Sequence, residues 1–287
     1  MSIIALATGS ELRGWADAVA ARGVTCLDQE VATFPKPGLV SHRDSGSHHD
    51  MDAGTFRQSA EAIRPYLAEL ALAGAKDAGM GRLRVIGLEA EAAMLVATDG
   101  INTHRGAIFG LGLLAAAAGR RHAGLDDPDW SLGRIVAESW GHDILNGPVL
   151  LHSHGQQVRR DYGMGGARVE AAQGFPCVYR IGVPALAAGE RLAPGDDEAA
   201  RVHTFFALLA EVEDTNLVHR GGLDGLASAR EMARGFLDWG GVGSAGWRGY
   251  ALAMHIDFIR RNLSPGGVAD LLAMSLFVQS LTMWDGT

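Results

Sequence analysis

The sequence contains little of what stabilises or targets many proteins of its size. Only two of its 287 residues are cysteines, Cys26 and Cys177, too few for a disulfide framework or a zinc site, which fits a reducing compartment such as the cytoplasm. Lysine is nearly absent, since Lys36 and Lys76 are the only two, and the remaining cations are arginines. Two explanations of this bias stay open: bidentate contacts to phosphate, and genomic base composition.

Long apolar runs are also missing. The longest uncharged apolar stretch, residues 107–119, is too short to cross a bilayer and contains three glycines. The N-terminal apolar run is too short for a signal sequence and has no basic region before it, so we expect a cytoplasmic protein without a membrane anchor. The net charge of −8 argues against broad binding to nucleic acid or anionic membranes, and an anionic ligand therefore needs a local cluster of donors.

Patterns typical of β-strands are scarce, and "RVIGL" and "CVYRIGV" are the only short candidates. Helical spacing of apolar residues dominates instead, for example at Leu12, Trp15, Val19 and Leu27. It recurs in five further segments: 56–72, 108–118, 132–145, 202–212 and 268–281. We therefore predict one all-α domain over residues 1–287, whose long polar, glycine-rich loops form the site. The stretch "ALAAGERLAPGDDEA" is the most linker-like part of the chain.

Familiar nucleotide motifs are absent as well. The glycine-rich stretch "YGMGGARVEAAQGFP" contains no G-x-G-x-x-G and follows no strand, and the chain has no Walker A lysine motif. Any nucleotide is therefore bound by another kind of site.

The polar loops collect histidine, arginine and carboxylates beside their glycines, which is the composition of a site. In "PKPGLVSHRDSGSHHDMD", Gly38 and Gly46 allow sharp turns, and the loop offers Lys36, Asp44, His48, His49, Asp50 and Asp52. These groups suit a hard cation such as Mg²⁺, or acid–base chemistry. The alternative is a solvated loop in which Asp52 or Thr55 caps the following helix.

The loop "DGINTHRG" interrupts an apolar region with polar side chains. Asn102 or Thr103 can cap the next helix, whose first free N–H groups favour an anion. His104 and Arg105 oppose the helix dipole there unless they help to bind a phosphate. Glu91 lies two helical turns before Thr98, approaching the same loop.

Two further loops have the same character. In "EDTNLVHRGG", Asp214 and Asn216 are oxygen ligands of the kind Mg²⁺ prefers, and His219 and Arg220 are phosphate donors. The equal alternative is a helix C-terminus closed by Gly221. In "NLSPGG", Ser264 is a good N-cap, while Gly266 and Gly267 permit a ligand to approach the backbone.

Taken together, these loops resemble one family, the triphosphoribosyl-dephospho-CoA synthases. The matching stretches are "PKPGLV", "GSHHDMD", "EAAMLVATDGINTHRGAIFGLG", "GARVEAAQGFP", "DTNLVHRGG" and "NLSPGGVADLLA", which run in order from about residue 30 to 280. One departure is Asp99, which stands where the family often has glycine and adds a negative charge beside the suspected phosphate site.

The resemblance implies a reaction and its partners. ATP gives its triphosphoribosyl unit to the 2′-hydroxyl of 3′-dephospho-CoA, adenine leaves, and Mg²⁺ accompanies the triphosphate. The product is the prosthetic-group precursor for the acyl carrier protein of malonate decarboxylase or citrate lyase. The segment "SAEAIRPYLAEL" and the richness in alanine and arginine favour malonate decarboxylase. A homodimer is an expected assembly for so apolar a chain.

Residue chemistry assigns roles to the matching positions. We expect Glu91 and Glu170 nearest the reacting sugar and Asp50 and Asp214 as metal ligands. The predicted substrate-binding residues are Lys36, His48, Asn102, His104, Arg105, Arg168, His219, Arg220, Ser264, Gly266 and Gly267.

Two other functions stay open. The pairs His49–Asp50 and His142–Asp143 are similar to the metal ligands of helical phosphohydrolases, which release phosphate rather than adenine. A non-catalytic helical module that binds CoA or a carrier protein is the third candidate.

Overall fold

The computed structural model describes residues 9–148 and 165–285, and every regular element within these two ranges is a helix. The N-terminal half contains α1 (Gly9–Ala32), α2 (Ala53–Ala75), α3 (Met80–Ala97), α4 (Arg105–His122) and α5 (Leu132–Asn146). The second half contains α7 (Gly166–Ala172), the π-helix η1 (Val178–Gly182), α8 (Val183–Leu192), α9 (Asp197–Glu211), α10 (Thr215–Asp238), the 3-10 helix η2 (Gly241–Gly243), α11 (Trp247–Arg260) and α12 (Gly266–Asp285). The prediction of an all-α fold is confirmed.

The start of α2 follows from its local sequence. The carboxylate of Asp52 accepts a hydrogen bond from the backbone N–H of Thr55 at 2.9 Å, and the Thr55 side chain returns a bond to the backbone of Asp52. This reciprocal capping box satisfies two N–H groups that the helix itself leaves free. The predicted cap at Asp52 is confirmed.

The apolar run 107–119 forms most of α4, and nearly all of its residues are buried. Glycine lets α4 approach α2 closely: a Cβ atom at Gly74 would lie 1.8 Å from the carbonyl oxygen of Ala116, and one at Gly119 would lie 1.9 Å from that of Ala71. A helix that is apolar on all sides belongs inside a core. The sequence run is therefore a central core helix.

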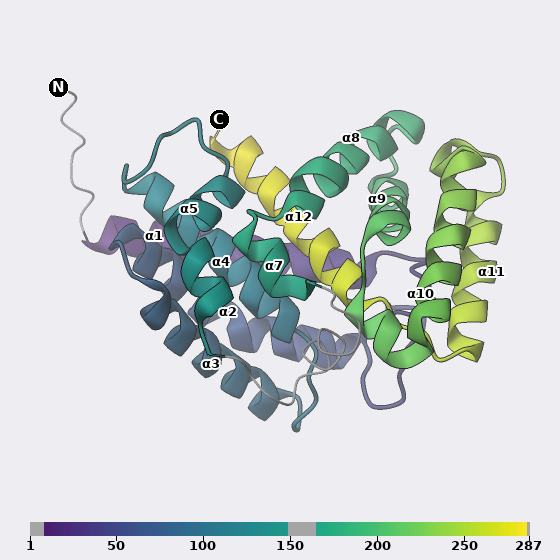
Figure 1. The fold of residues 1–287 in the computed structure, drawn as a ribbon, viewed down its shortest axis with the longest axis horizontal. Coiled ribbons are helices and arrows are strands. Elements are labelled where there is room, and N and C mark those ends of the chain that lie inside the picture. The colour runs from purple at the N-terminus through teal and green to yellow at the C-terminus, as the bar shows by residue number, and fades with distance from the viewer. Residues whose placement is uncertain (1–8, 149–164, 286–287) are drawn as a thin grey trace.

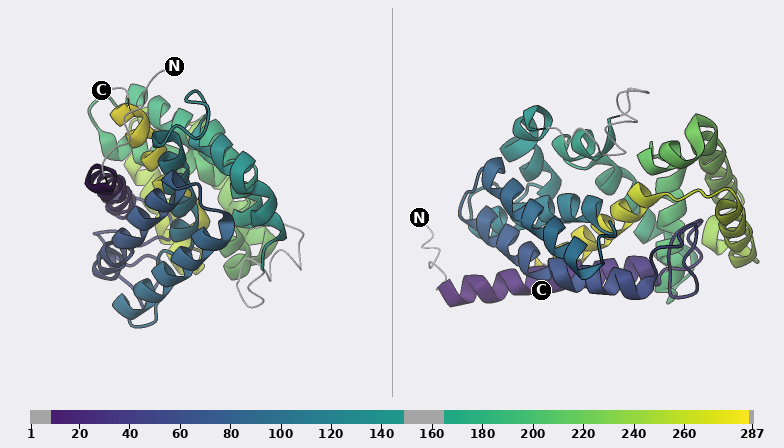
Figure 2. Two further views of the ribbon diagram at one scale, coloured as in Figure 1. Left: turned by 90° about the vertical axis from the view of Figure 1, so that its left-hand side faces the viewer. Right: turned by 90° about the horizontal axis from the view of Figure 1, so that it is seen from below.

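The last helix is central too. By length and composition, Gly266–Trp284 could cross a membrane, but 56% of this window is buried inside the molecule, as in a core helix. In Figure 1, α12 crosses the middle of the molecule, and it contacts α1 and α4 from the N-terminal half and α8 and α9 from the second half. Figure 2 shows α1 extending along the edge of the N-terminal half. The two halves of the chain thus share α12.

Three segments differ from their sequence patterns. "RVIGL" lies within α3, and "CVYRIGV" forms η1 and the start of α8, so both strand candidates are wrong. The linker-like stretch 185–199 joins α8 to α9, and these helices pack so closely that a Cβ at Gly189 would lie 2.6 Å from the Cα of Ala200.

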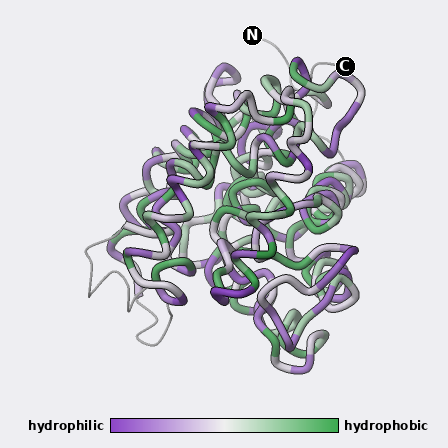
Figure 3. The backbone as a smooth tube through the Cα atoms, turned by 90° about the vertical axis from the view of Figure 1, so that its right-hand side faces the viewer, coloured by the Kyte–Doolittle hydropathy of each residue, from purple (hydrophilic) through white to green (hydrophobic). Residues whose placement is uncertain are grey.

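Buried residues from α1 through α12 form one cluster, and hydrophobic residues alternate with hydrophilic ones along the helices in Figure 3. The linker composition therefore marks a helix–helix turn inside one core.

Candidate active site

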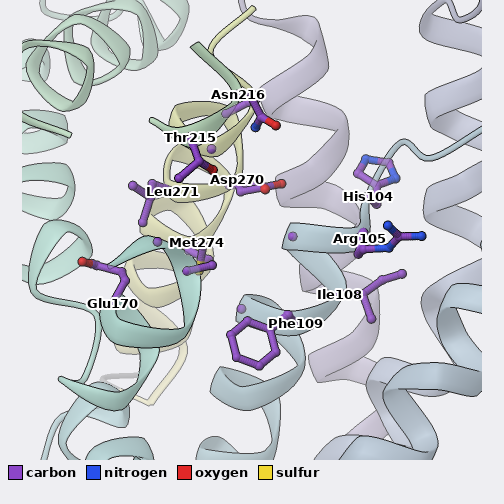
Figure 4. Close-up of a pocket in the computed structure, with 18 of the residues that line it drawn as sticks. His104, Arg105, Ile108, Phe109, Glu170, Thr215, Asn216, Asp270, Leu271 and Met274 are labelled. Atoms are coloured by element: carbon purple, nitrogen blue, oxygen red, sulfur yellow. The ribbon is translucent and has the colours of Figure 1, made fainter. Parts of the chain in front are cut away.

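A cavity of about 1510 Å³ lies where the two halves meet α12. It is lined by the loop before α2, by α3, α7 and the starts of α4, α10 and α12. Its floor is apolar, with Ile108, Phe109, Leu271 and Met274 among the lining side chains labelled in Figure 4. This volume exceeds the typical range for a single drug-sized ligand. The cavity places polar groups at the helix starts and apolar groups along the floor.

The loop "DGINTHRG" leads into the cavity wall. The N-cap of α4 is His104, which makes no side-chain capping bond, so the predicted cap at Asn102 or Thr103 is wrong. The Asn102 carboxamide oxygen instead accepts the backbone N–H of Arg105 at 3.3 Å, and Thr103 donates its hydroxyl to Ser59. The Nε of Arg105 donates to the Glu91 carboxylate at 2.9 Å. Asn102, Arg105 and Glu91 all line the cavity, so the structure brings these predicted residues together. Glu91 thus pairs with Arg105 at the cavity wall.

His104 is the most enclosed of the predicted ligands, with 3% of its surface exposed. Its Nδ1 lies 2.6 Å from the Ser59 hydroxyl and its ring packs edge-on against Phe56. Its Nε2 has no hydrogen-bond partner among residues 9–148 and 165–285. Burial lowers the pKa of His104 to about 3, because the apolar surroundings penalise the imidazolium. His104 is therefore a neutral hydrogen-bonding group and not a cation.

A second cluster joins the loop before α2 to the start of α12. Arg220 donates to His48 Nδ1 at 3.3 Å, and His48 Nε2 lies 2.9 Å from the Ser264 hydroxyl. Since Nδ1 is the acceptor, Nε2 carries the hydrogen and donates to Ser264. Burial and the Arg220 charge lower the pKa of His48 to about 4. The arrangement leaves the Ser264 hydrogen available for a ligand.

Arg220, near the start of α10, holds this cluster together through further hydrogen bonds. Arg220 also donates to the carbonyl oxygen of Ser47 at 3.0 Å and to the Asn262 side chain at 2.9 Å. His219 lines the cavity beside it. His48, His219, Arg220 and Ser264 are therefore assembled as the sequence predicted.

Both carboxylate oxygens of Asp214 accept hydrogen bonds from backbone N–H groups. One oxygen accepts the N–H groups of Asn216 and Leu217 at the start of α10, at 2.8 and 3.0 Å, and the other accepts that of Val268 in α12 at 2.9 Å. Burial raises the pKa of Asp214, and these backbone bonds oppose the rise. The segment starts a helix at Thr215, and the helical backbone breaks at Gly222 (φ 65°, ψ −170°), so both a helix start and a helix end beside Gly221 are present. Asp214 ties two helices together.

The glycine pair of α12 packs tightly against this junction. A Cβ at Gly266 would lie 2.9 Å from the Asn216 amide nitrogen, and one at Gly267 would lie 3.0 Å from the Asp214 carboxylate. Both glycines line the cavity. They bring backbone close to the cavity, as predicted, and also leave space for Asp214 and Asn216.

Two predicted residues of α7 line the opposite wall. Glu170 accepts the backbone N–H of Cys177 at 2.7 Å, and in Figure 4 its carboxylate points away from Asp270. Burial raises the pKa of Glu170. Arg168 donates to carbonyl oxygens at the end of α5, including Ile144 and Gly147, and so holds α7 against α5.

Lys36 lies apart from the lining residues. It is 1% exposed, its ammonium group bonds the Glu30 carboxylate, and burial lowers its pKa. Glu30 itself lines the cavity. Lys36 therefore pairs with the Glu30 carboxylate from the side that faces away from the cavity.

The carboxylates within the described ranges do not build a resident metal centre. No group of three or more His, Cys, Asp or Glu side chains gathers closely enough there to hold an ion. Asp214 is occupied by backbone N–H groups, and the Asp50 side chain is 62% exposed at the cavity rim. The His142–Asp143 pair is exposed on α5, outside the cavity lining.

Sequence reasoning missed Asp270, Glu30 and Ser59. Asp270 is the only charged residue of α12 before Asp285, and an isolated carboxylate in an apolar helix is the signal that could have found it. Ser59 and Glu30 carry no such signal, because they are ordinary positions on the polar-looking faces of α2 and α1. Only folding places them beside His104 and Lys36.

Fold and site define the class: an all-α enzyme whose cavity, walled by three helix starts, offers cation and hydrogen-bond donors beside carboxylates. A family model described as ATP:dephospho-CoA triphosphoribosyl transferase matches residues 16–287, and the chain belongs to this family. The resemblance seen in the loops is confirmed, and the protein is a transferase.

Curated relatives agree with this family over most of their length. A probable 2-(5″-triphosphoribosyl)-3′-dephosphocoenzyme-A synthase of Acinetobacter calcoaceticus is 39% identical over 257 residues, covering 88% of this chain and 87% of that protein. The corresponding synthase of Pectobacterium atrosepticum is 41% identical, covering 87% of this chain and 84% of its own. The chain is similar to these proteins over most of its length. No solved structure matches it significantly.

Proposed function

We propose that this protein transfers the triphosphoribosyl unit of ATP to the 2′-hydroxyl of 3′-dephospho-CoA and releases adenine. The observation that carries the proposal is the match of residues 16–287 to the transferase family. The cavity supports it, because it is large, has an apolar floor for adenine and pantetheine groups, and has polar helix starts for phosphates.

Binding of the triphosphate falls to the donors around the cavity. Arg105 faces it from α4, with His104 and Asn102 beside it, and Arg220, His219 and Ser264 face it from α10 and α12. Because His48 is neutral and donates to Ser264, it orients that hydroxyl rather than supplying charge. The cationic contribution therefore comes mainly from the two arginines.

The chemical step is displacement at the anomeric carbon, with oxocarbenium character in the transition state. Glu170 is the proposed base for the 2′-hydroxyl, since a carboxylate whose pKa is raised by burial accepts a proton more readily once ionised. Glu91 holds Arg105 in place. We further propose that Mg²⁺ enters with ATP as part of the substrate. The exposed Asp50 carboxylate at the cavity rim is the proposed protein ligand of this ion.

The pathway and cellular setting belong to the same proposal. "SAEAIRPYLAEL" and the alanine- and arginine-rich composition favour malonate decarboxylase over citrate lyase as the recipient, with an acyl carrier subunit taking the product onward. We expect a cytoplasmic homodimer. Light scattering of the purified protein measures the oligomer, and loading of each purified carrier subunit in a coupled assay distinguishes the two pathways.

Product analysis tests the reaction directly. Purified protein, ATP, 3′-dephospho-CoA and Mg²⁺ should yield free adenine together with an adduct heavier by one triphosphoribosyl unit, measured by chromatography and mass spectrometry. Phosphate or pyrophosphate without adenine would establish the phosphohydrolase instead. Saturable binding without any product would establish a non-catalytic module.

A further inference from the structure

Asp270 is a carboxyl group that the proposed chemistry has not yet used. It is the only charged side chain of α12 before Asp285, and it lines the cavity. In Figure 4 its carboxyl extends from α12 toward the start of α4, between Thr215 and Asn216 on one side and His104 and Arg105 on the other. An ionisable group on an otherwise apolar core helix is costly to bury, so its place needs a chemical reason.

The first turn of α4 is built around this carboxyl group. A Cβ atom at Gly106 would lie 2.0 Å from Asp270 Oδ2, so a side chain at residue 106 would displace it. The backbone N–H of Ala107 donates to the carboxyl group. These contacts hold the Asp270 carboxyl group against Gly106 and Ala107, in the turn of α4 that directly follows His104 and Arg105.

The charges around Asp270 favour its protonated form. Within the described ranges it forms no ion pair, and its charged neighbours are Glu30 of α1 and Asp214 before α10, both acidic. Arg105 of α4 pairs with Glu91, Lys36 pairs with Glu30, and the adjacent His104 is neutral. Burial, followed by the Glu30 and Asp214 charges, raises the pKa of Asp270 well above its ordinary value, and the Ala107 N–H opposes this only in part.

The other carboxyl groups of the cavity are differently engaged. Glu91 accepts from a guanidinium, Asp214 accepts from three backbone N–H groups, and Glu170 accepts the Cys177 N–H on the opposite wall of the cavity. A carboxyl group whose pKa is raised by burial and by acidic neighbours, opposite carboxylates held by hydrogen-bond donors, is the arrangement that divides acid from base in glycosyl chemistry.

We propose that Asp270 is the general acid that protonates the departing adenine. The inference rests on the proposed transfer reaction and adds the residue that donates a proton to adenine, its leaving group. The C1′–N9 bond breaks and its electron pair stays on adenine, while the Asp270 proton moves to N7, so that neutral adenine leaves. The 2′-hydroxyl oxygen forms the new bond to C1′, and its proton passes to Glu170. Proton exchange with water then restores both carboxyl groups.

Asp270→Asn tests the role, because the amide keeps the shape and accepts the Ala107 N–H but has no acidic proton. We expect kcat with ATP to fall about 10²–10⁴-fold, the usual contribution of a positioned acid. Asp224→Asn, an exposed aspartate of α10 outside the cavity lining, is the matched control and should retain wild-type kcat. Circular dichroism and thermal melting verify that both variants fold.

A better leaving group separates acid catalysis from positioning. With 7-methyl-ATP the base leaves without protonation, so Asp270→Asn should turn it over within about fivefold of wild type. An equal loss on ATP and on 7-methyl-ATP would overturn the proposal and make Asp270 a structural cap of α4.

The pH profile provides a readout with ATP alone. Wild-type kcat should fall on the alkaline side as Asp270 loses its proton, and this limb should be absent in Asp270→Asn. A limb that persists unchanged in the variant would overturn the proposal. Wild-type release of adenine in the same assay tests the transfer reaction itself, so failure of the proposed function is distinguishable from failure of this inference.

Discussion

The arginines of the cavity wall, and the buried Lys36 behind it, are bonded to protein partners before any ligand arrives. Arg105 contacts Glu91, Arg220 contacts Ser47, His48 and Asn262, and Lys36 contacts Glu30. A half-buried charge without a partner costs free energy, and the protein therefore supplies one. These bonds hold the side chains in position and reduce the conformational entropy that a ligand would otherwise have to remove.

The Arg105 guanidinium offers the clearest test of phosphate binding. Its Nε bonds Glu91, and its two Nη groups form no hydrogen bond within the described residues, which leaves them for a bidentate contact. Arg105→Lys loses that fork, so KM for ATP should rise about 10–100-fold with a smaller change in kcat. The exposed Arg64 of α2 is the control, and Arg64→Lys should change neither constant. Steady-state kinetics measures both, and an unchanged KM in Arg105→Lys would remove Arg105 from the phosphate site.

The buried His104 makes stability depend on pH. Its folded pKa of about 3 lies below the usual value of 6.5, so between these limits the unfolded chain binds more protons than the folded one. The free energy of unfolding should therefore fall as pH decreases from about 6.5 toward 4, by up to roughly 3 kcal/mol from this residue. Urea unfolding at several pH values measures the slope. His104→Gln should show a shallower slope, and an identical slope would contradict the assignment.

At the scale of elements, helix starts build the site and glycines set the distances between helices. Asp214 ties the starts of α10 and α12 together, and Asp270 joins α12 to the first turn of α4. The sequence predicted the cap of α2 correctly because Asp52 and Thr55 are local neighbours. It did not predict that Asp214 serves a second helix, because Val268 is 54 residues away.

The crossing of α2 and α4 gives a matched pair of glycine substitutions. Gly74→Ala would place a Cβ atom 1.8 Å from a backbone oxygen, which side-chain rotation cannot relieve. We expect it to lower the free energy of unfolding by at least about 2 kcal/mol. The exposed Gly81 of α3 has no atom within 4 Å of an added Cβ, so Gly81→Ala should be neutral or stabilising by up to about 1 kcal/mol. Urea titration compares the two, and equal effects would refute the close crossing.

At the scale of the whole molecule, one core joins both halves of the chain. Buried residues of α1 through α12 form a single cluster, and α12 contributes to both sides of it. The linker-like stretch 185–199 does not separate two cores, because α8 and α9 pack against each other there.

This single core predicts cooperative unfolding. Differential scanning calorimetry should give one transition whose calorimetric and van't Hoff enthalpies agree for the folding unit, and circular dichroism should report the same midpoint. Binding of ATP and 3′-dephospho-CoA should raise that midpoint, since both bind only the folded cavity. Two separated transitions would show that the halves fold independently.

The sequence by itself determined the helices, the family and most of the residues around the cavity. Apolar spacing of three and four residues specifies helices locally, and six loop motifs in order identify the family. Its errors came from short segments such as "RVIGL", where β-branched residues fit a helix face as well as a strand.

Only the tertiary structure decided what each polar side chain does. Protonation and pairing depend on burial and on neighbours far away in the chain: Ser59 for His104, Glu30 for Lys36, and Val268 for Asp214. The same holds for Asp270, whose acidic neighbours and whose contact with Gly106 come from α1, α4 and the start of α10. Local sequence fixes which groups are available, while desolvation and long-range contacts fix their charge and direction, because electrostatic free energies depend on distances in space rather than along the chain.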